Sequence, residues 1–169
     1  MWLGLEVPMN EHELEECLAM LATTPDWIEE QARRVPADGW EVKIHGGEGG
    51  WNRRQMLAHI VTIDYRHANR IRLSAGLPND TGVASQSQLP AINDWNQQQV
   101  DERAARSVDE LLAEYRRNRA DFIALVRSLT PEQRGRVSID RAGPPPTPFY
   151  DWLPHVHEHA VSHMQEVTG

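Results

Sequence analysis

The sequence predicts an all-α protein, a four-helix bundle that forms a single domain over residues 1–169. Two observations support this class. Four long stretches place apolar residues at helical spacing, whereas runs that alternate in the manner of β-strands are few. Long loops are expected at about residues 36–51, 77–90 and 137–150, and one of them is long enough to act as a crossover connection within such a bundle.

The first helical stretch is expected in two pieces. Residues 11–22 carry leucines and Cys17 at helical spacing, with acidic residues between them. Thr24 and Pro25 have the form of an N-cap followed by proline at the first helical position, so a second piece is predicted to run to about Arg34. Cys17 lies on the apolar stripe and is interpreted as a small buried core residue rather than a reactive thiol.

The second stretch has a defined beginning and end. Asn52 is the predicted N-cap of a long helix from Arg53 to about Ser74, and Gly76 is expected to end that helix. The residues expected on its inward stripe are Met56, His59, Ile60, Ile63 and His67.

A further helix is expected to begin near Ala91 and to run towards Ala105. Ser107 and Glu110 then form a capping box, which predicts a helix from there to about Leu129. The residues expected in the core from this helix are Leu111, Leu112, Tyr115, Phe122, Leu125 and Val126. A cluster of arginines on the same helix is interpreted as a solvated face rather than an anion site: Arg116, Arg117 and Arg119.

The chain reaches its last helix through a short turn that begins at Thr130 and an extended, proline-rich connection over residues 137–150. Asp151 is the expected N-cap of a helix that runs to about Val167. Pro154 would fall in the first turn of this helix, where its missing N–H costs little.

Four of the eight histidines lie in this last helix. Three of them, His155, His159 and His163, are spaced by four residues, so on a helix they share one stripe and rise by ~6 Å per step. Any adjacent pair can reach a single metal ion, as two histidines of one helix do in the metalloprotease motif. His157 points about 200° away from His159 and is expected to lie off this site.

A third ligand has to come from another helix, and His59 is the candidate because it lies on an inward stripe. A lone histidine at such a position is usually a core residue, and a plain bundle with buried histidines is the alternative here. The histidine pair on the last helix makes a metal site the preferred interpretation of His59. Neutral imidazole is a common metal ligand, and three histidines with a water are typical of a catalytic zinc site.

The composition excludes several function classes. A net charge of −8 argues against a nucleic-acid partner, which would favour a basic face. No apolar run approaches the ~20 residues of a membrane span, so no membrane association is expected. The first residues turn acidic at once, unlike a signal peptide, and a single cysteine excludes an internal disulfide. A cytoplasmic location is therefore expected.

Two segments carry a family resemblance. Residues 51–60, WNRRQMLAHI, resemble the second helix of the DinB superfamily, where tryptophan, leucine and a histidine followed by an apolar residue share this spacing. Residues 159–167, HAVSHMQEV, are similar to the C-terminal H-x-x-x-H signature of that superfamily. Residues 94–112 also resemble the N-terminal domains of mycothiol-dependent maleylpyruvate isomerases. With the opening helix, the resemblance spans essentially the whole chain.

The resemblance implies an up-and-down, DinB-like bundle that holds a divalent metal, most often zinc or nickel. The ligands that it implies are His59, His159 and His163, each of which matches the motif. His155 extends the stripe one turn upstream, so His155 with His159 is the alternative pair. The downstream pair is preferred because His155 directly follows Pro154 at the start of the helix.

One position departs from the family pattern. The superfamily commonly has glutamine three residues after the last histidine, whereas this chain has Glu166 there and Gln165 one position earlier. A carboxylate at this position could reach the site or be solvated. Histidine ligands suit zinc, nickel, copper and iron alike, so the residues alone leave the identity of the metal open.

The enzymes of known activity in this superfamily are metal-dependent thiol transferases or isomerases that use a low-molecular-weight thiol such as mycothiol or bacillithiol. A bound divalent ion lowers the pKa of a thiol or a water, which creates a nucleophile at neutral pH. The resemblance therefore favours transfer of a thiol to a small electrophile. Asp64 and His67, near His59 on the same helix, are candidates for acid–base or supporting roles, with a surface ion pair as the alternative.

Two other functions fit the same ligands. One is hydrolysis by a metal-activated water. The other is a non-catalytic, stress-associated metal-binding bundle that serves as a dimerisation or ligand-binding module. An open metal position beside a pocket favours an enzyme, whereas a fourth protein ligand favours the non-catalytic protein. A small-molecule substrate is expected, and a homodimer is compatible with such bundles.

Overall fold

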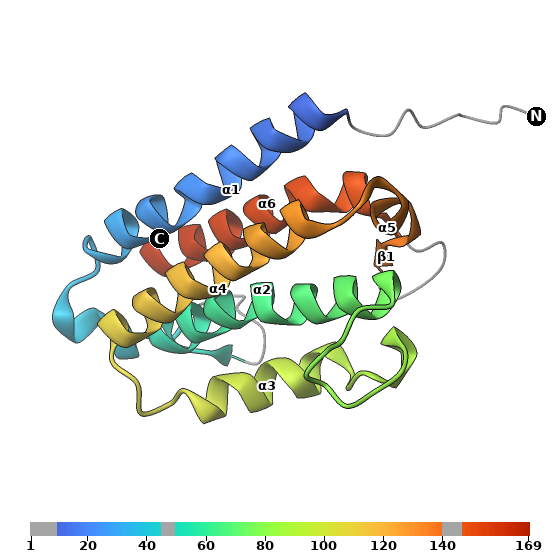
Figure 1. Cartoon of the computed structure of the whole chain (residues 1–169). Helices are drawn as coiled ribbons and strands as arrows, with labels where there is room; N and C mark the ends of the chain where they lie inside the picture. The colour runs from blue at the N-terminus through green and yellow to red at the C-terminus, as the bar shows by residue number, and fades with distance from the viewer. Residues whose placement is uncertain (1–9, 45–49, 140–146) are drawn as a thin grey trace, which may run out of the picture.

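The computed structural model describes residues 10–44, 50–139 and 147–169. Its body is a bundle of four long helices (Figure 1). These are α1 (Glu11–Ala32), α2 (Arg53–Ala75), α4 (Val108–Ser128) and α6 (Phe149–Thr168). Two shorter helices connect them, α3 (Ile92–Glu102) and α5 (Pro131–Arg136). The predicted four-helix bundle is confirmed.

The order of the helices in space differs from their order in the chain. α1 packs against α4 and α6, and α2 packs against the same two helices, so α1 and α2 lie diagonally across the bundle. α3 carries the chain back along α2, and α4 therefore runs in the same direction as α2 while α1 and α6 run the opposite way (Figure 1). The expected crossover connection is thus partly helical. The expected up-and-down order is corrected, because this connection makes the neighbouring helices α2 and α4 parallel.

The predicted helix caps of α2 and α4 are present. Asn52 accepts a hydrogen bond from the backbone N–H of Gln55, and the Gln55 side chain accepts one from the N–H of Asn52. Ser107 and Glu110 make the same reciprocal pair at the start of α4. Gly76 ends α2 with a φ of 70°, a left-handed conformation that glycine adopts without strain.

The loops contain short regular pieces. In the first predicted loop, a 3-10 turn (Ala37–Glu41, η1) is followed by an antiparallel bridge between Lys43 and Asn52. A 3-10 turn, η3 (Gln86–Gln88), lies in the second. In the third, β1 (Ser138–Ile139) pairs antiparallel with β2 (Thr147–Pro148). The remaining parts of the first and third loops, residues 45–49 and 140–146, lie outside the described residues.

The predicted break at Thr24–Pro25 is wrong, because α1 continues through Pro25. Proline cannot donate the N–H that would normally bond to the carbonyl of Leu21, four residues earlier. The guanidinium of Arg119 donates to that carbonyl instead, at 3.4 Å. A side chain from α4 therefore replaces the missing backbone donor, and α1 stays whole.

The start of the last helix is also corrected. α6 begins at Phe149, with Pro148 as its N-cap, so Asp151 lies inside the first turn and is not the cap. The pairing of β2 with β1 brings the chain to this earlier start, and the N–H of Phe149 bonds to the carbonyl of Val137 at 3.1 Å. Pro154 consequently lies within the helix rather than in its first turn.

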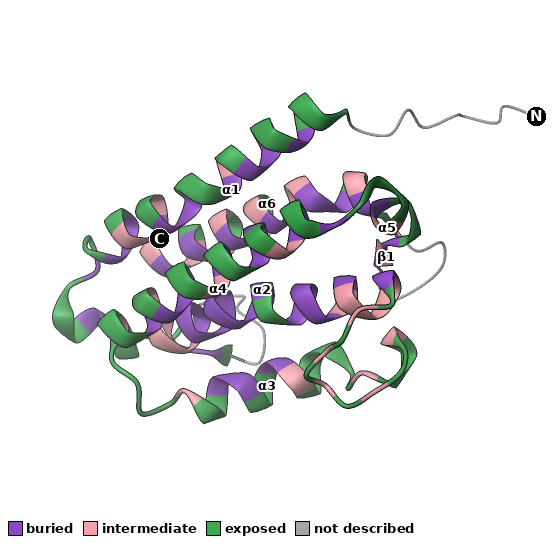
Figure 2. Cartoon of the chain, viewed as in Figure 1, coloured by how far each residue is buried: buried purple, intermediate pink, exposed green. Residues whose placement is uncertain are grey.

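Two apolar clusters fill the bundle, one at each end. The inward faces of the four long helices are buried along their length (Figure 2). Cys17 is buried in one cluster, as predicted, and its pKa is raised by burial. The core residues predicted from α4 are buried, except that Leu112 and Leu125 are only partly covered. None of the described helices combines the length and hydropathy that crossing a bilayer requires.

A layer of polar side chains separates the two clusters, and it corrects the prediction for Arg119. Arg119 is 1% exposed, not solvated. Its guanidinium donates to both carboxylate oxygens of Asp64, at 2.6 and 3.2 Å, and to the hydroxyl of Tyr115 at 2.7 Å. Burial lowers the pKa of Arg119, but Asp64 and Tyr115 outweigh it and hold that pKa above its usual value. Arg116, in contrast, is exposed as predicted.

Candidate metal centre

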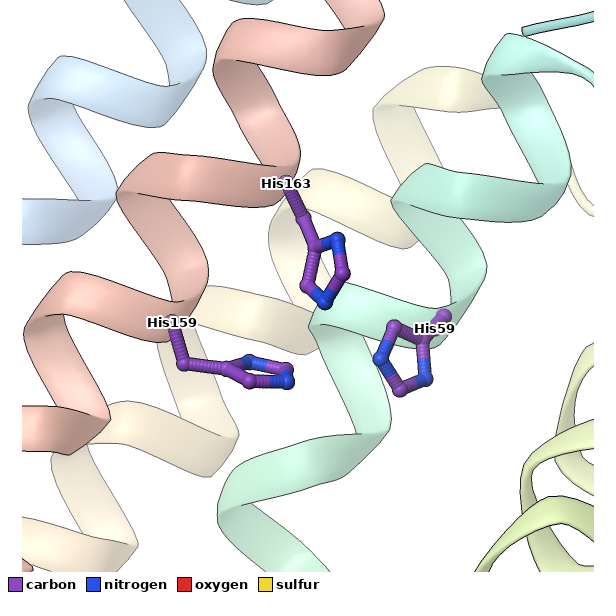
Figure 3. Close-up of side chains that lie close together, drawn as sticks. All are labelled: His59, His159 and His163. Carbon is purple, nitrogen blue, oxygen red and sulfur yellow. The ribbon is translucent and has the colours of Figure 1, made fainter. Parts of the chain in front are cut away.

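Three histidines from two helices converge at the interface between α2 and α6. His59 comes from α2, and His159 and His163 come from α6 (Figure 3). One ring nitrogen of each lies within 4.8 Å of the corresponding nitrogens of the other two. The rings point toward one another in Figure 3, and their centroids are 4.4 to 5.4 Å apart. Three imidazoles so close together can share one ion.

The nitrogens at this centre have few partners in the protein. His59 is 1% exposed, and neither of its ring nitrogens has a hydrogen-bond partner among the described residues. Nδ1 of His159 is also buried and, within the same ranges, unpartnered. A buried polar atom without a partner is costly unless a ligand completes it. These nitrogens therefore suit a ligand that accepts their lone pairs.

Both of the more buried histidines are neutral at physiological pH. Burial, and then the neighbouring His159 and His163, lowers the pKa of His59 to about 3. Burial also lowers the pKa of His159 to about 3, with further contributions from His163, His155 and Arg119. Neutral imidazole is the form that binds metal, so burial prepares these side chains as ligands without competition from protons.

The orientation of His163 depends on Glu166. Nδ1 of His163 lies 3.2 Å from Oε1 of Glu166, one turn further along α6. A hydrogen bond from Nδ1 to this carboxylate leaves Nε2 with its lone pair free to face the other two rings. The same arrangement of carboxylate and histidine is usual behind metal ligands, where it fixes the ring and raises its basicity. Glu166 thus reaches the site through His163.

We expect Glu166→Ala to weaken the binding of zinc by about 10- to 100-fold, the usual cost of removing such a partner. A chelator-competition titration measures this change. Glu158→Ala is the matched control, because Oε2 of Glu158 lies 3.5 Å from Nδ1 of His155 in the same i, i+3 relation. Equal zinc affinities in the two variants would show that Glu166 does not support the metal site.

Trp51 forms one wall of the centre. Its ring packs against that of His59, with centroids 5.2 Å apart, and its Nε1 donates to Oε1 of Gln97 on α3 at 3.0 Å. The indole is 4% exposed and so keeps water away from this side of His59. The sequence motif includes Trp51 but does not indicate its contact with Gln97, because that pair is 46 residues apart.

The other histidines of α6 lie away from the centre. The ring of His155 is 6.2 Å from that of His159 by centroid, its side chain is 41% exposed, and it does not join the convergent group. The geometry favours His159 with His163, although the reason given from Pro154 does not hold. Nδ1 of His157 lies 2.9 Å from the hydroxyl of Thr24 on α1, which agrees with its predicted place off the site.

The two predicted acid–base candidates differ in their surroundings. Asp64 is fully buried and forms an ion pair with Arg119, so this ion pair is internal rather than on the surface. A carboxylate held in this way is better suited to a structural role than to proton transfer. His67 is buried beside Trp152, with ring centroids 4.4 Å apart. Electrostatic coupling to His159 places His67 near the centre, and its catalytic role stays a prediction.

The donor set fits a divalent metal ion. Tetrahedral ligands at 2.0–2.1 Å from zinc lie about 3.4 Å apart, so small rotations of the three rings bring them to that spacing. Among the residues that the structure describes, no further histidine, cysteine or carboxylate joins the group. Within those residues, three nitrogen ligands therefore leave a coordination position open.

Comparison with known proteins agrees with this fold. The family model of the DinB superfamily matches residues 11–167. The chain is also similar to the solved structure of YfiT from Bacillus subtilis, which is described as a probable metal-dependent hydrolase with an unusual four-helix bundle topology. The TM-score is 0.74 at 16% identity, over 99% of this chain and 90% of that one. No curated protein sequence matches the chain significantly.

Proposed function

This chain belongs to the DinB superfamily, and we propose that within it the chain acts as a divalent-metal-dependent hydrolase of small molecules. The observation that carries this proposal is the convergence of three imidazoles. Two of them are neutral by burial, and both nitrogens of His59 and Nδ1 of His159 have no hydrogen-bond partner among the described residues. The description of YfiT as a probable metal-dependent hydrolase supports the same reaction class.

The protein contributes a set of three histidine ligands to this chemistry. His59, His159 and His163 would hold the ion, and zinc or nickel are the expected metals. When bound, such an ion lowers the pKa of a water in its open position and polarises a substrate carbonyl or phosphoryl oxygen. Glu166 keeps His163 in the tautomer that presents Nε2, and Trp51 excludes water from one side of His59.

Thiol transfer is the competing reaction at the same site. The family resemblance favours it, because a bound thiol would be activated by the same ion as water is. Cys17 is not a candidate for that thiol, because it is buried in the apolar cluster at the other end of the bundle. A transferase would therefore take its thiol from solution, as mycothiol, bacillithiol or a similar molecule.

A single assay series separates the reactions. Tag-free protein loaded with zinc or nickel would be tested on chromogenic esters and amides, and then on an aryl halide electrophile with mycothiol or bacillithiol. We expect metal-dependent hydrolysis that is lost in His163→Ala and kept in His155→Ala. Turnover only in the presence of the thiol would establish the transferase instead. A metal-loaded protein inactive in both assays would favour the non-catalytic bundle.

A further inference from the structure

Arg66 on α2 is a buried charge with an incomplete set of partners. The side chain is 4% exposed. Its Nη2 donates to the carbonyl of Pro90 at 2.9 Å, and the guanidinium lies 4.9 Å from the ring centroid of Trp95 on α3. Nε and Nη1 are buried, and neither has a hydrogen-bond partner anywhere in the described ranges. Two donors of one buried cation are thus unsatisfied.

Within the described residues, no carboxylate forms an ion pair with Arg66, and the neighbouring charge that acts on it is that of Arg70. Burial, followed by Arg70 one turn along α2, lowers the pKa of Arg66 to about 10. The side chain is still protonated at neutral pH. A buried charge usually has an opposite charge and a full set of hydrogen bonds, because leaving either out is costly. Arg119 has both in the same bundle, in contrast to Arg66.

His67 is next to Arg66 and shares its situation. It is 9% exposed, and its Nδ1 is buried with no partner among the described residues. Burial and the nearby Arg70, His159, Arg66 and His155 hold the pKa of His67 well below its usual value, so the ring is neutral and carries one N–H. Arg66 and Arg70 therefore create a positive potential at this point, with donors available.

This polar pair lies beside the metal centre. Arg66 follows His59 by seven residues, which places the two on nearly the same face of α2 and about 10 Å apart along its axis. Because α6 packs against α2 and runs in the opposite direction, His155 and His159 of α6 lie on the side of His67. An anion bound at Arg66 would therefore lie about 10 Å along α2 from His59.

We infer that Arg66 and His67 bind the oxyanion group of a small substrate, a carboxylate or a phosphate, and direct the rest of that substrate towards His59 and His159. Pro90 takes one N–H of Nη2. The other N–H of Nη2 therefore forms, with the unpartnered N–H on its own edge of the guanidinium, the planar fork that matches two oxygens of such an anion. The neutral ring of His67 supplies a further donor. Trp95 of α3 covers the guanidinium, and α3 packs mainly against α2. An anion that enters this site therefore displaces α3. The inference rests on the proposed function and narrows its substrates to anions.

Calorimetric titration of metal-free protein tests the site apart from catalysis. Succinate and inorganic phosphate are the probes, and neutral succinamide is the control ligand. We expect at least one oxyanion to bind the wild type, succinamide not to bind, and Arg66→Met to weaken binding by at least about tenfold. Arg72→Met is the matched control, because Arg72 lies on the same helix about 120° from Arg66 and should leave the affinity within about twofold.

The relative affinities of succinate and phosphate identify the group that the site prefers. If Arg66→Met does not fold, Arg66→Lys carries the test, since it keeps the charge but loses the two-pronged donor and should weaken binding several-fold. Unchanged affinity in these variants, or no oxyanion binding by the wild type, would overturn the inference. Oxyanion binding that depends on Arg66, in a metal-loaded protein without hydrolytic activity, would instead count against the proposed function alone.

Discussion

Arg119→Met is expected to destabilise the protein by about 3–5 kcal/mol, the cost of removing one partner from a buried ion pair. The substitution leaves the carboxylate of Asp64 buried without its cation. It also removes the donor to the carbonyl of Leu21, which Pro25 cannot supply, and the partner of the Tyr115 hydroxyl. Urea denaturation followed by circular dichroism measures the change in the free energy of unfolding.

Arg116→Met is the control for this effect. Arg116 lies on the same helix and bonds to Asp26 and Glu29, but its side chain is 50% exposed, so its loss should cost less than about 1 kcal/mol. The double variant Asp64→Leu, Arg119→Met should recover much of the loss, because both charges are then absent. If Arg119→Met is no less stable than Arg116→Met, the polar layer is not what holds these helices together.

His163→Ala is expected to weaken the binding of zinc or nickel by at least about 100-fold, which corresponds to ~2.7 kcal/mol. The loss of a ligand should exceed the 10- to 100-fold cost of losing a supporting partner such as Glu166. The side chain of His163 is 16% exposed, so its removal disturbs the core less than removal of His59 would. Competition with a chromogenic chelator gives the affinities.

His155→Ala is the matched control, with the same residue type two turns earlier on the same helix. It should change the affinity for metal by less than about twofold, since its ring lies outside the convergent group. The opposite pattern, with His155→Ala losing metal and His163→Ala keeping it, would assign the site to the alternative pair of His155 and His159.

The sequence was sufficient to predict the parts of this fold that depend on local interactions. Asn52 and Gly76 act on backbone within a few residues of themselves, so the caps of α2 could be read directly. The histidines of α6 were recognisable because a step of four residues maps to one face of a helix. His59 required one further step, the inference that an inward stripe of another helix would meet them.

The features that the sequence did not reveal depend on contacts between residues far apart in the chain. The continuity of α1 depends on Arg119, 98 residues after the Leu21 carbonyl that it bonds. The burial of Arg119 was nevertheless indicated by its spacing of four from Tyr115 on the inward stripe, a signal that its charge obscured. The spacing of seven from His59 likewise put Arg66 on nearly the inward face of α2, but its contacts with Pro90 and Trp95 are long-range and could not be read from the sequence.

The most direct test of the metal centre is the metal content of tag-free protein, measured by mass spectrometry for the wild type and for His59→Ala, His163→Ala. We expect about one divalent ion per chain in the wild type and none in the double variant. No metal in either protein, together with a thermal stability that zinc or nickel does not change, would contradict it. The three histidines would then be buried core residues.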